Sequence, residues 1–99
     1  MTELTVQNLL PKAKQALRVV TSAFDGEILD LIRAAAQNLT TRGVTITESS
    51  GTVQPLVQRC ILTYVRMNFG DPADYERLKE SFDEQLGQLM TTTNFTTWG

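Results

Sequence analysis

The residues able to do chemistry in this 99-residue chain are few: one cysteine, no histidine and eleven carboxylates. Without histidine, Ser–His and Cys–His catalysis and the commonest protein metal ligand are all missing. Cys60 falls on the apolar stripe of an expected helix, which favours a small buried hydrophobe over a nucleophile. A single cysteine also excludes an internal disulfide and a thiolate metal cluster.

Six of the carboxylates form two groups, Asp25 with Glu27 and Asp30, and Glu80 with Asp83 and Glu84. Metal binding or acid–base catalysis would need such groups to converge on a pocket with basic or histidine partners. These acids instead lie at a helix start and along an expected solvent-facing helix surface. The chain also has no glycine-rich phosphate loop. We therefore expect no enzyme, no cofactor and no metal site.

The segment 91–99 is uncharged and rich in threonine, yet it carries Phe95 and the single tryptophan, Trp98. Aromatic side chains on a polar terminal segment are typical of anchors that become ordered on a partner. A frayed tail is the alternative interpretation. We expect Phe95 and Trp98, with their neighbours Thr93 and Asn94, to contact a partner.

The composition bounds the fold to one small domain over residues 1–99, with a core at about 9–90. The hydrophobic share of 41% and charged share of 20% are those of a globular protein. The net charge of −2 disfavours a dedicated nucleic-acid binder. Neither a signal peptide nor a membrane span is expected, so we expect the chain to be synthesised and at first to remain in a reducing cytoplasm.

Four helices are expected to position these residues. The first two cover about 11–18 and 23–41, and the stretch 54–90 forms two more, joined by a turn at 69–72. Ser22 and Asp25 have the outline of a capping box, Gly43 and Gly70 suit left-handed helix ends, and Pro72 suits a first helical position. The last two helices carry apolar stripes of Leu56, Val57, Cys60, Ile61, Tyr64 and Val65, and of Tyr75, Leu78, Phe82, Leu86, Leu89 and Met90.

The segment 44–53 breaks the helical period. Its first four residues alternate apolar and polar side chains around Val44 and Ile46, which predicts a short strand or an extended arm. Residues 48–52 have turn composition. Such a loop is either functional or a flexible surface connection. We take Val44 and Ile46 as further candidate partner contacts.

A helix–turn–helix interpretation of 54–90 fails on charge. The second helix would bring five acids to DNA phosphates against Arg77 and Lys79 alone. Its charged face is instead expected to be solvated, with Lys79 and Asp83 spaced for an ion pair. The expected fold class is all-α: a small four-helix bundle with a long loop between helices 2 and 3 and an extended C-terminal tail.

Several segments together resemble the head–tail connector proteins of tailed bacteriophages, also called adaptor or head completion proteins. The matching runs are ALRV (16–19), FDGEI (24–28), LIRAA (31–35), PLVQRCILTYV (55–65) with Phe69-Gly70, YERL (75–78) and SFD (81–83). The resemblance covers about residues 9–90. The loop at 44–53 and the threonine-rich tail depart from it, so partner contacts there do not carry over.

The resemblance implies a structural virion protein without catalytic activity. Copies would form a ring, with a dodecamer as the expected size, between the portal and a head-closure or tail protein. Double-stranded DNA would pass through this channel without specific binding as the genome leaves the head. The protein would be located in the neck of the virion, and in the host cytoplasm during assembly. It would not contact a membrane. The alternative is a small cytoplasmic DNA-packaging or regulatory helper that binds nucleic acid or a motor protein.

Overall fold

The computed structural model describes residues 1–91, and the fold of this part is all-α with one small β-hairpin. The expected fold class is therefore confirmed. The elements are α1 Glu3–Leu17, α2 Asp25–Thr41, β1 Glu48–Ser49, β2 Thr52–Val53, α3 Pro55–Asn68 and α4 Tyr75–Thr91.

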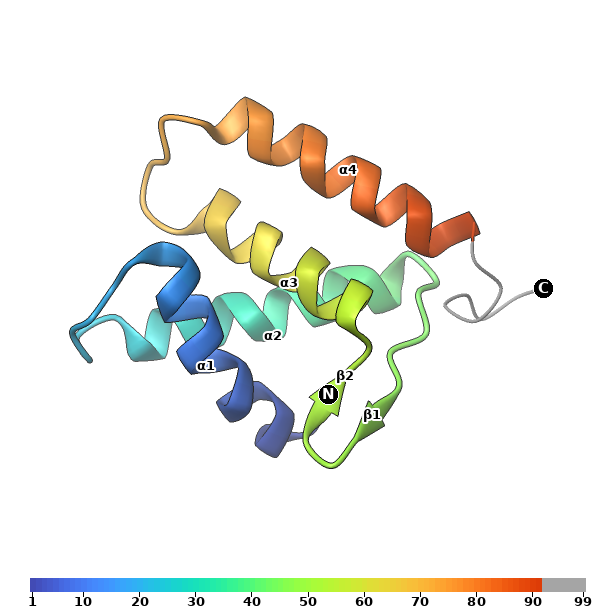
Figure 1. Ribbon diagram of the computed structural model, residues 1–99, viewed down its shortest axis with the longest axis horizontal. Helices are drawn as coiled ribbons and strands as arrows, with labels where there is room; N and C mark the ends of the chain where they lie inside the picture. Colours follow the sequence, from blue (N-terminus) through green and yellow to red (C-terminus); the bar gives the residue numbers. More distant parts are fainter. Residues whose placement is uncertain (92–99) are drawn as a thin grey trace.

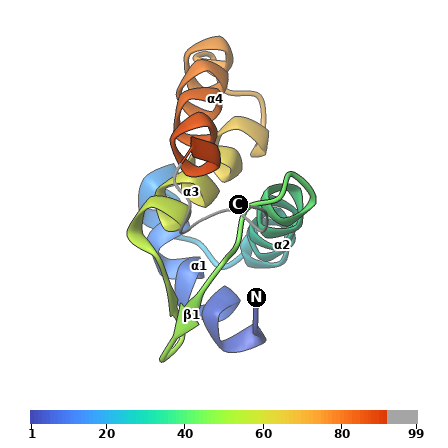
Figure 2. The same cartoon turned by 90° about the vertical axis from the view of Figure 1, so that its right-hand side faces the viewer.

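Helix α3 is the centre of the arrangement. It packs against α1 and α2 on one side and against α4 on the other (Figure 1). Figure 2 shows α4 above α3, with α1 and α2 on the far side of α3 from α4. The Cα trace is 18 Å across its shortest dimension. Because a helix with side chains is about 10–12 Å wide, a shape this thin leaves every helix a solvent-facing side.

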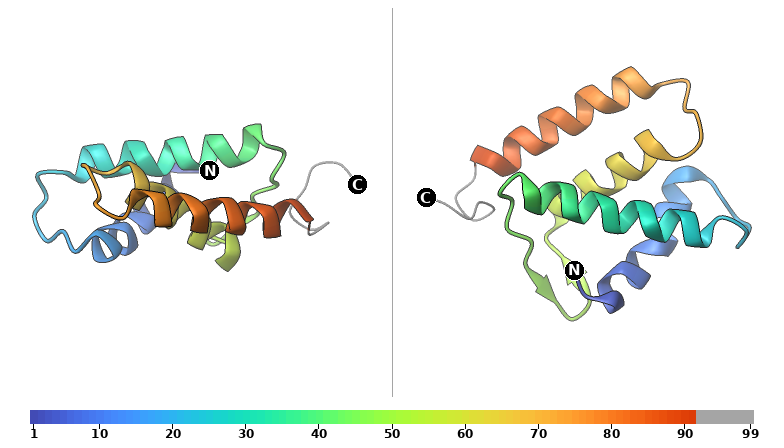
Figure 3. Two further views of the ribbon diagram at one scale, coloured as in Figure 1. Left: turned by 90° about the horizontal axis from the view of Figure 1, so that it is seen from above. Right: turned by 180° about the vertical axis from the view of Figure 1, so that it is seen from behind.

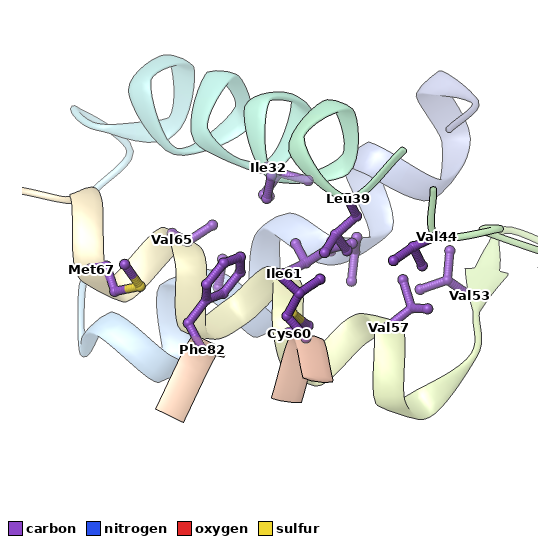
Figure 4. Close-up of a cluster of buried hydrophobic side chains, with 14 of the residues drawn as sticks. Ile32, Leu39, Val44, Val53, Val57, Cys60, Ile61, Val65, Met67 and Phe82 are labelled. Atoms are coloured by element: carbon purple, nitrogen blue, oxygen red, sulfur yellow. The ribbon is translucent and has the colours of Figure 1, made fainter. Parts of the chain in front are cut away.

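The core is a continuous apolar cluster in which each helix buries one stripe. Its central members are Ile28, Ile32, Ile61 and Val65, none of which is exposed. Cys60 lies among them and is also fully buried, so the sequence interpretation of Cys60 as a small core residue is confirmed (Figure 4). Phe82 of α4 reaches the same cluster and lies 5.7 Å from Tyr64, centroid to centroid.

Helix α1 begins eight residues earlier than the sequence predicted. Pro11, taken as a first helical residue, lies inside the helix. The side chain of Thr2 caps the helix by accepting a hydrogen bond from the Thr5 amide at 3.4 Å. Val6, Leu9 and Ala13 form one buried stripe, and its burial outweighs the hydrogen bond that proline removes.

Helix α2 also begins differently from the prediction. The residue at its N-cap is Phe24, which makes no side-chain cap, so the capping box expected from Ser22 is wrong. Asp25 instead forms an ion pair with Lys14 of α1, with 2.9 Å between Oδ1 and Nζ. This acid therefore joins two helices. Gly43, with φ of 91°, has the left-handed conformation expected after α2.

The turn between α3 and α4 confirms part of its prediction and corrects the rest. Gly70 has the expected positive φ, 65°. Pro72 precedes α4 and is not its first residue, since the first helical hydrogen bond runs from the Leu78 amide to the Asp74 carbonyl. Leu56 and Tyr75, predicted to lie on the apolar stripes, are 40% and 39% exposed. Both lie in the first turn of their helix.

The loop between α2 and α3 contains a hairpin where the sequence indicated only turn composition. Strands β1 and β2 are antiparallel, with Glu48 opposite Val53 and Ser49 opposite Thr52. Ser50 and Gly51 join them with φ of 54° and 77°, and two positive φ values are the mark of a type I′ turn. Of the two alternatives predicted for 44–47, a short strand or an extended arm, the strand is not formed: Val44 makes a single bridge, and the two-stranded ladder lies at 48–53. The right-hand view of Figure 3 shows the hairpin next to the beginning of α1.

Candidate partner interface

Cys60 has no chemistry to offer at neutral pH. Burial raises the pKa of its thiol to about 11, so the group stays protonated and poorly nucleophilic. Within residues 1–91, no three acidic, cysteine or histidine side chains gather closely enough to hold a metal ion. We therefore looked for surfaces that suit a macromolecular partner.

Only part of the expected partner surface lies in the described residues. Val44 is 1% exposed and packs in the chain's own core near Val53 and Val57 (Figure 4). A partner cannot reach that side chain, so its expected interface role is not carried forward. Ile46 is half-buried against the core. Thr93, Asn94, Phe95 and Trp98 lie outside the described residues, and their partner role stays a prediction.

The hairpin is fastened to the start of α1 by polar contacts. The Thr2 amide and hydroxyl both donate to Oε1 of Glu48, at 2.8 and 2.9 Å. Hydrogen bonds from the Thr5 hydroxyl and the Thr2 amide hold the pKa of Glu48 below its usual range. The side chain of Asn8 donates to the Gly51 carbonyl at 3.0 Å. These contacts make the hairpin part of the folded body and not a free arm.

An open groove of about 480 Å³ runs between α3 and α4, with Ala16 of α1 at one end. Its lining residues are apolar, neutral polar and cationic, and no carboxylate lines it. Arg59 and Arg66 come from α3, and Arg77 comes from α4. The other lining residues are Pro55, Gln58, Leu62, Thr63, Leu78, Ser81 and Gln85. We call this surface the arginine groove.

The arginines of this groove are only partly neutralised by the chain itself, since Arg66 also helps to lower the pKa of Asp74 and Arg59 lines a small hollow together with Glu84. Arg77 pairs with Asp74 at 2.6 Å, and the Arg77 guanidinium holds the pKa of Asp74 below its usual range. Neither Arg59 nor Arg66 makes an ion pair within residues 1–91. Two arginines seven residues apart on one helix lie on the same strip, so a positive surface is left for something else to neutralise.

The outer surface of α4 has the opposite charge. Glu76, Glu80 and Glu84 are exposed, follow one another at four-residue spacing, and make no ion pair within the described part of the chain. Like charges at this spacing destabilise a helix slightly, because the side chains are neighbours. Lys79 and Asp83 lie beside them and form the predicted ion pair at 3.4 Å. We call the three glutamates the acidic ridge.

A third surface, at the α1–α2 connection, is apolar. Val20 is 98% exposed, and Val19 beside it is half-buried. Phe24 is 45% exposed and packs edge-on against Phe69 at 5.5 Å between ring centroids. These exposed apolar side chains make the α1–α2 connection a candidate contact surface.

Sequence reasoning missed the arginine groove because the groove exists only where α3 and α4 lie together. One signal was available. Arg59 and Arg66 are two helical turns apart on the polar side of α3, opposite the apolar stripe that was used to predict the helix.

The comparison with known families gives a match over residues 9–96, to the family described as Phage connector protein. This chain belongs to that family. The match begins at residue 9, as the resemblance predicted, and ends at residue 96, six residues beyond the predicted end at about residue 90. No curated protein and no solved structure matches.

Membership of the phage connector family indicates a structural role in the particle of a tailed phage. It implies association with portal and tail or head components at the virion neck. None of the helices in residues 1–91 is long and apolar enough to cross a membrane. A surface with a cationic groove, an acidic ridge and an apolar end suits a structural protein that binds several other proteins.

Proposed function

We propose that this connector forms a ring between the portal and the tail or head-closure protein, and that the ring extends the channel for the DNA. The observation that carries this proposal is the family match over 88 of 99 residues, from 9 to 96. The thin shape and the three contact surfaces support it, since a ring subunit must touch neighbours on two sides and other proteins above and below.

The charge of the chain is consistent with DNA passing without being held. The net charge is −2, so a ring of copies presents a negative surface overall. Phosphates are repelled by such surfaces, and a channel that does not bind DNA lets it slide. A ring of the same number of copies as the portal, with a dodecamer as the expected size, would give the channel one continuous wall.

The C-terminal aromatics belong to the same proposal. Phe95 and Trp98 would anchor the chain on a neighbouring protein in the neck. Replacing both by alanine should leave the folded domain as stable as the wild type, while fewer copies enter particles. Equal numbers of wild-type and variant copies in purified particles would contradict this anchoring role.

The experiment that tests the ring is quantitative mass spectrometry of purified phage particles, with this chain counted against the portal subunit. Equal copy numbers are the expected result. Absence from mature particles, with the chain left in the infected-cell extract, would overturn the proposal and favour the packaging or regulatory helper. The same digest supplies a control, because the ratio of portal to major capsid protein reports on particle integrity.

A further inference from the structure

We propose that the arginine groove of one copy receives the acidic ridge of a second copy of this chain. This inference rests on the proposed ring and names the two surfaces that would join its subunits. It assigns a role to Arg59, Arg66 and the three glutamates of the ridge.

The groove needs a negatively charged occupant. Arg59 is exposed, Arg66 is half-buried, and neither has an ion-pair partner within residues 1–91. The apolar side chains of Leu62 and Leu78 line the same groove as these cations. An arginine held against apolar surface binds carboxylates more strongly than a fully solvated one, because less water competes for the guanidinium.

The acidic ridge is opposite in charge to the arginine groove, and its glutamates have a spacing similar to that of Arg59 and Arg66. Arg59 and Arg66 are seven residues apart, which places them about 10.5 Å apart along α3. Glu76 and Glu84 are eight residues apart, which places them about 12 Å apart along α4, with Glu80 between them. Two helices of similar length can therefore lie side by side with their opposite charges in register.

The positions of the two surfaces permit a closed ring. The groove lies on the side of α4 that carries Ser81 and Gln85, whereas Glu76 and Glu80 lie on its outer side. Glu84 is at the border, since it shares a small hollow with Arg59. A contact between different patches of identical subunits is heterologous, so each copy keeps one free groove and one free ridge for its next neighbours.

DNA is a poorer occupant of the groove than a second copy. A phosphate backbone in the groove would neutralise Arg59 and Arg66 alone. The acidic ridge would then stay without a counter-charge. Pairing groove with ridge neutralises both surfaces in one contact.

The test uses charge reversal in a phage that lacks its own copy of this gene and is supplied with variants of the full chain. Arg59→Glu with Arg66→Glu should reduce the copies per particle by about tenfold or more, because acids then face acids. Glu76→Arg with Glu80→Arg should do the same. All four substitutions in one chain should restore the wild-type number.

Co-expression of the two reversed variants sharpens the test. One variant has an acidic groove and an acidic ridge, and the other has a basic groove and a basic ridge. Each is expected to fail alone, and the two together should assemble in equal amounts as an alternating ring. Lys12→Glu serves as a matched control for Arg59→Glu, because Lys12 is exposed on α1 and makes no ion pair within residues 1–91. This control should not change the copy number.

The outcomes separate this inference from the proposed ring. Wild-type chain missing from particles would overturn the ring itself. Wild-type chain present at the portal number, with reversed variants that still assemble or a fourfold variant that does not recover, would overturn only the groove-to-ridge contact. Binding of a short DNA duplex at low salt that Arg59→Glu with Arg66→Glu abolishes would also overturn it, in favour of a phosphate occupant. Thermal melts of each variant exclude unfolding as the cause.

Discussion

The two sides of α3 differ in composition, burial and expected role. One side carries Val57, Cys60, Ile61 and Val65, all fully buried between α1, α2 and α4. The other side opens on the groove and carries Arg59 and Arg66. Substitutions on the buried side should therefore change the stability of the chain, and substitutions on the groove side should change its assembly.

The largest effect is expected from Ile61→Ala on the buried side. Ile61 has no exposed surface, and its removal leaves a cavity in the cluster that joins all the helices. The free energy of unfolding should fall by about 3 kcal/mol. Denaturant unfolding followed by circular dichroism measures this loss. Leu62→Ala, one residue along on the half-exposed groove side, is the control, and an equal loss there would break the comparison.

A smaller effect is expected from Gly51→Ala in the hairpin that leads into α3. Gly51 has a φ of 77°, and an added Cβ would lie 2.5 Å from Nδ2 of Asn8 and 3.0 Å from Leu4. The free energy of unfolding should fall by about 1–2 kcal/mol, from backbone strain and from loss of the Asn8 hydrogen bond. Gly87→Ala in α4 is the matched control, because its Cβ meets nothing within 4 Å. That control should be neutral or stabilising by up to about 1 kcal/mol, and a loss equal to that of Gly51→Ala would contradict the strain.

A still smaller effect is expected from Glu48→Gln, which weakens the hydrogen bonds between the β-hairpin and the start of α1. The neutral amide accepts hydrogen bonds from Thr2 less strongly than the carboxylate does. A loss of about 0.5–1 kcal/mol is expected at neutral pH. The folded pKa of Glu48 is lowered, so its contribution is present above the ordinary glutamate value of about 4.3 and disappears as pH falls through the folded value. Thermal melts should therefore show the variant and the wild type converging in acid, and a constant difference would exclude the carboxylate as the cause.

The smallest effect on stability is expected from Arg59→Gln with Arg66→Gln on the groove side. Neither arginine makes an ion pair within residues 1–91, so the free energy of unfolding should change by less than about 0.5 kcal/mol. The same denaturant unfolding measures it. A loss comparable to that of Ile61→Ala would show that the groove side also holds the fold together, and the distinction between the two sides would fail.

The buried side of α3 was predictable from sequence, and the groove side was not. The helical spacing of Val57, Ile61 and Val65 predicts the buried stripe directly. Gly70 predicts the turn that brings α4 back along α3. The groove depends on how closely α4 lies along α3, which no single helix encodes. It is a property of packing.

Two local errors have physical causes. Pro11 suits a first helical position so well that it masked a helix beginning at Glu3, although Val6 and Leu9 continue its apolar stripe. The hairpin was missed because its strands are only two residues long, too short for alternation to be recognised. The Ser50-Gly51 turn was its only signal. The candidate contacts at 93–98 rest on composition alone and remain a prediction.

The most direct measurement of the central claim is a high-resolution cryo-electron microscopy reconstruction of the neck of intact particles. The account predicts a ring in which Arg59 and Arg66 of each copy face Glu76 and Glu80 of the next, with the buried side of α3 unchanged from that in the isolated chain. A ring in which the arginine groove faces water, DNA or a different protein would contradict it.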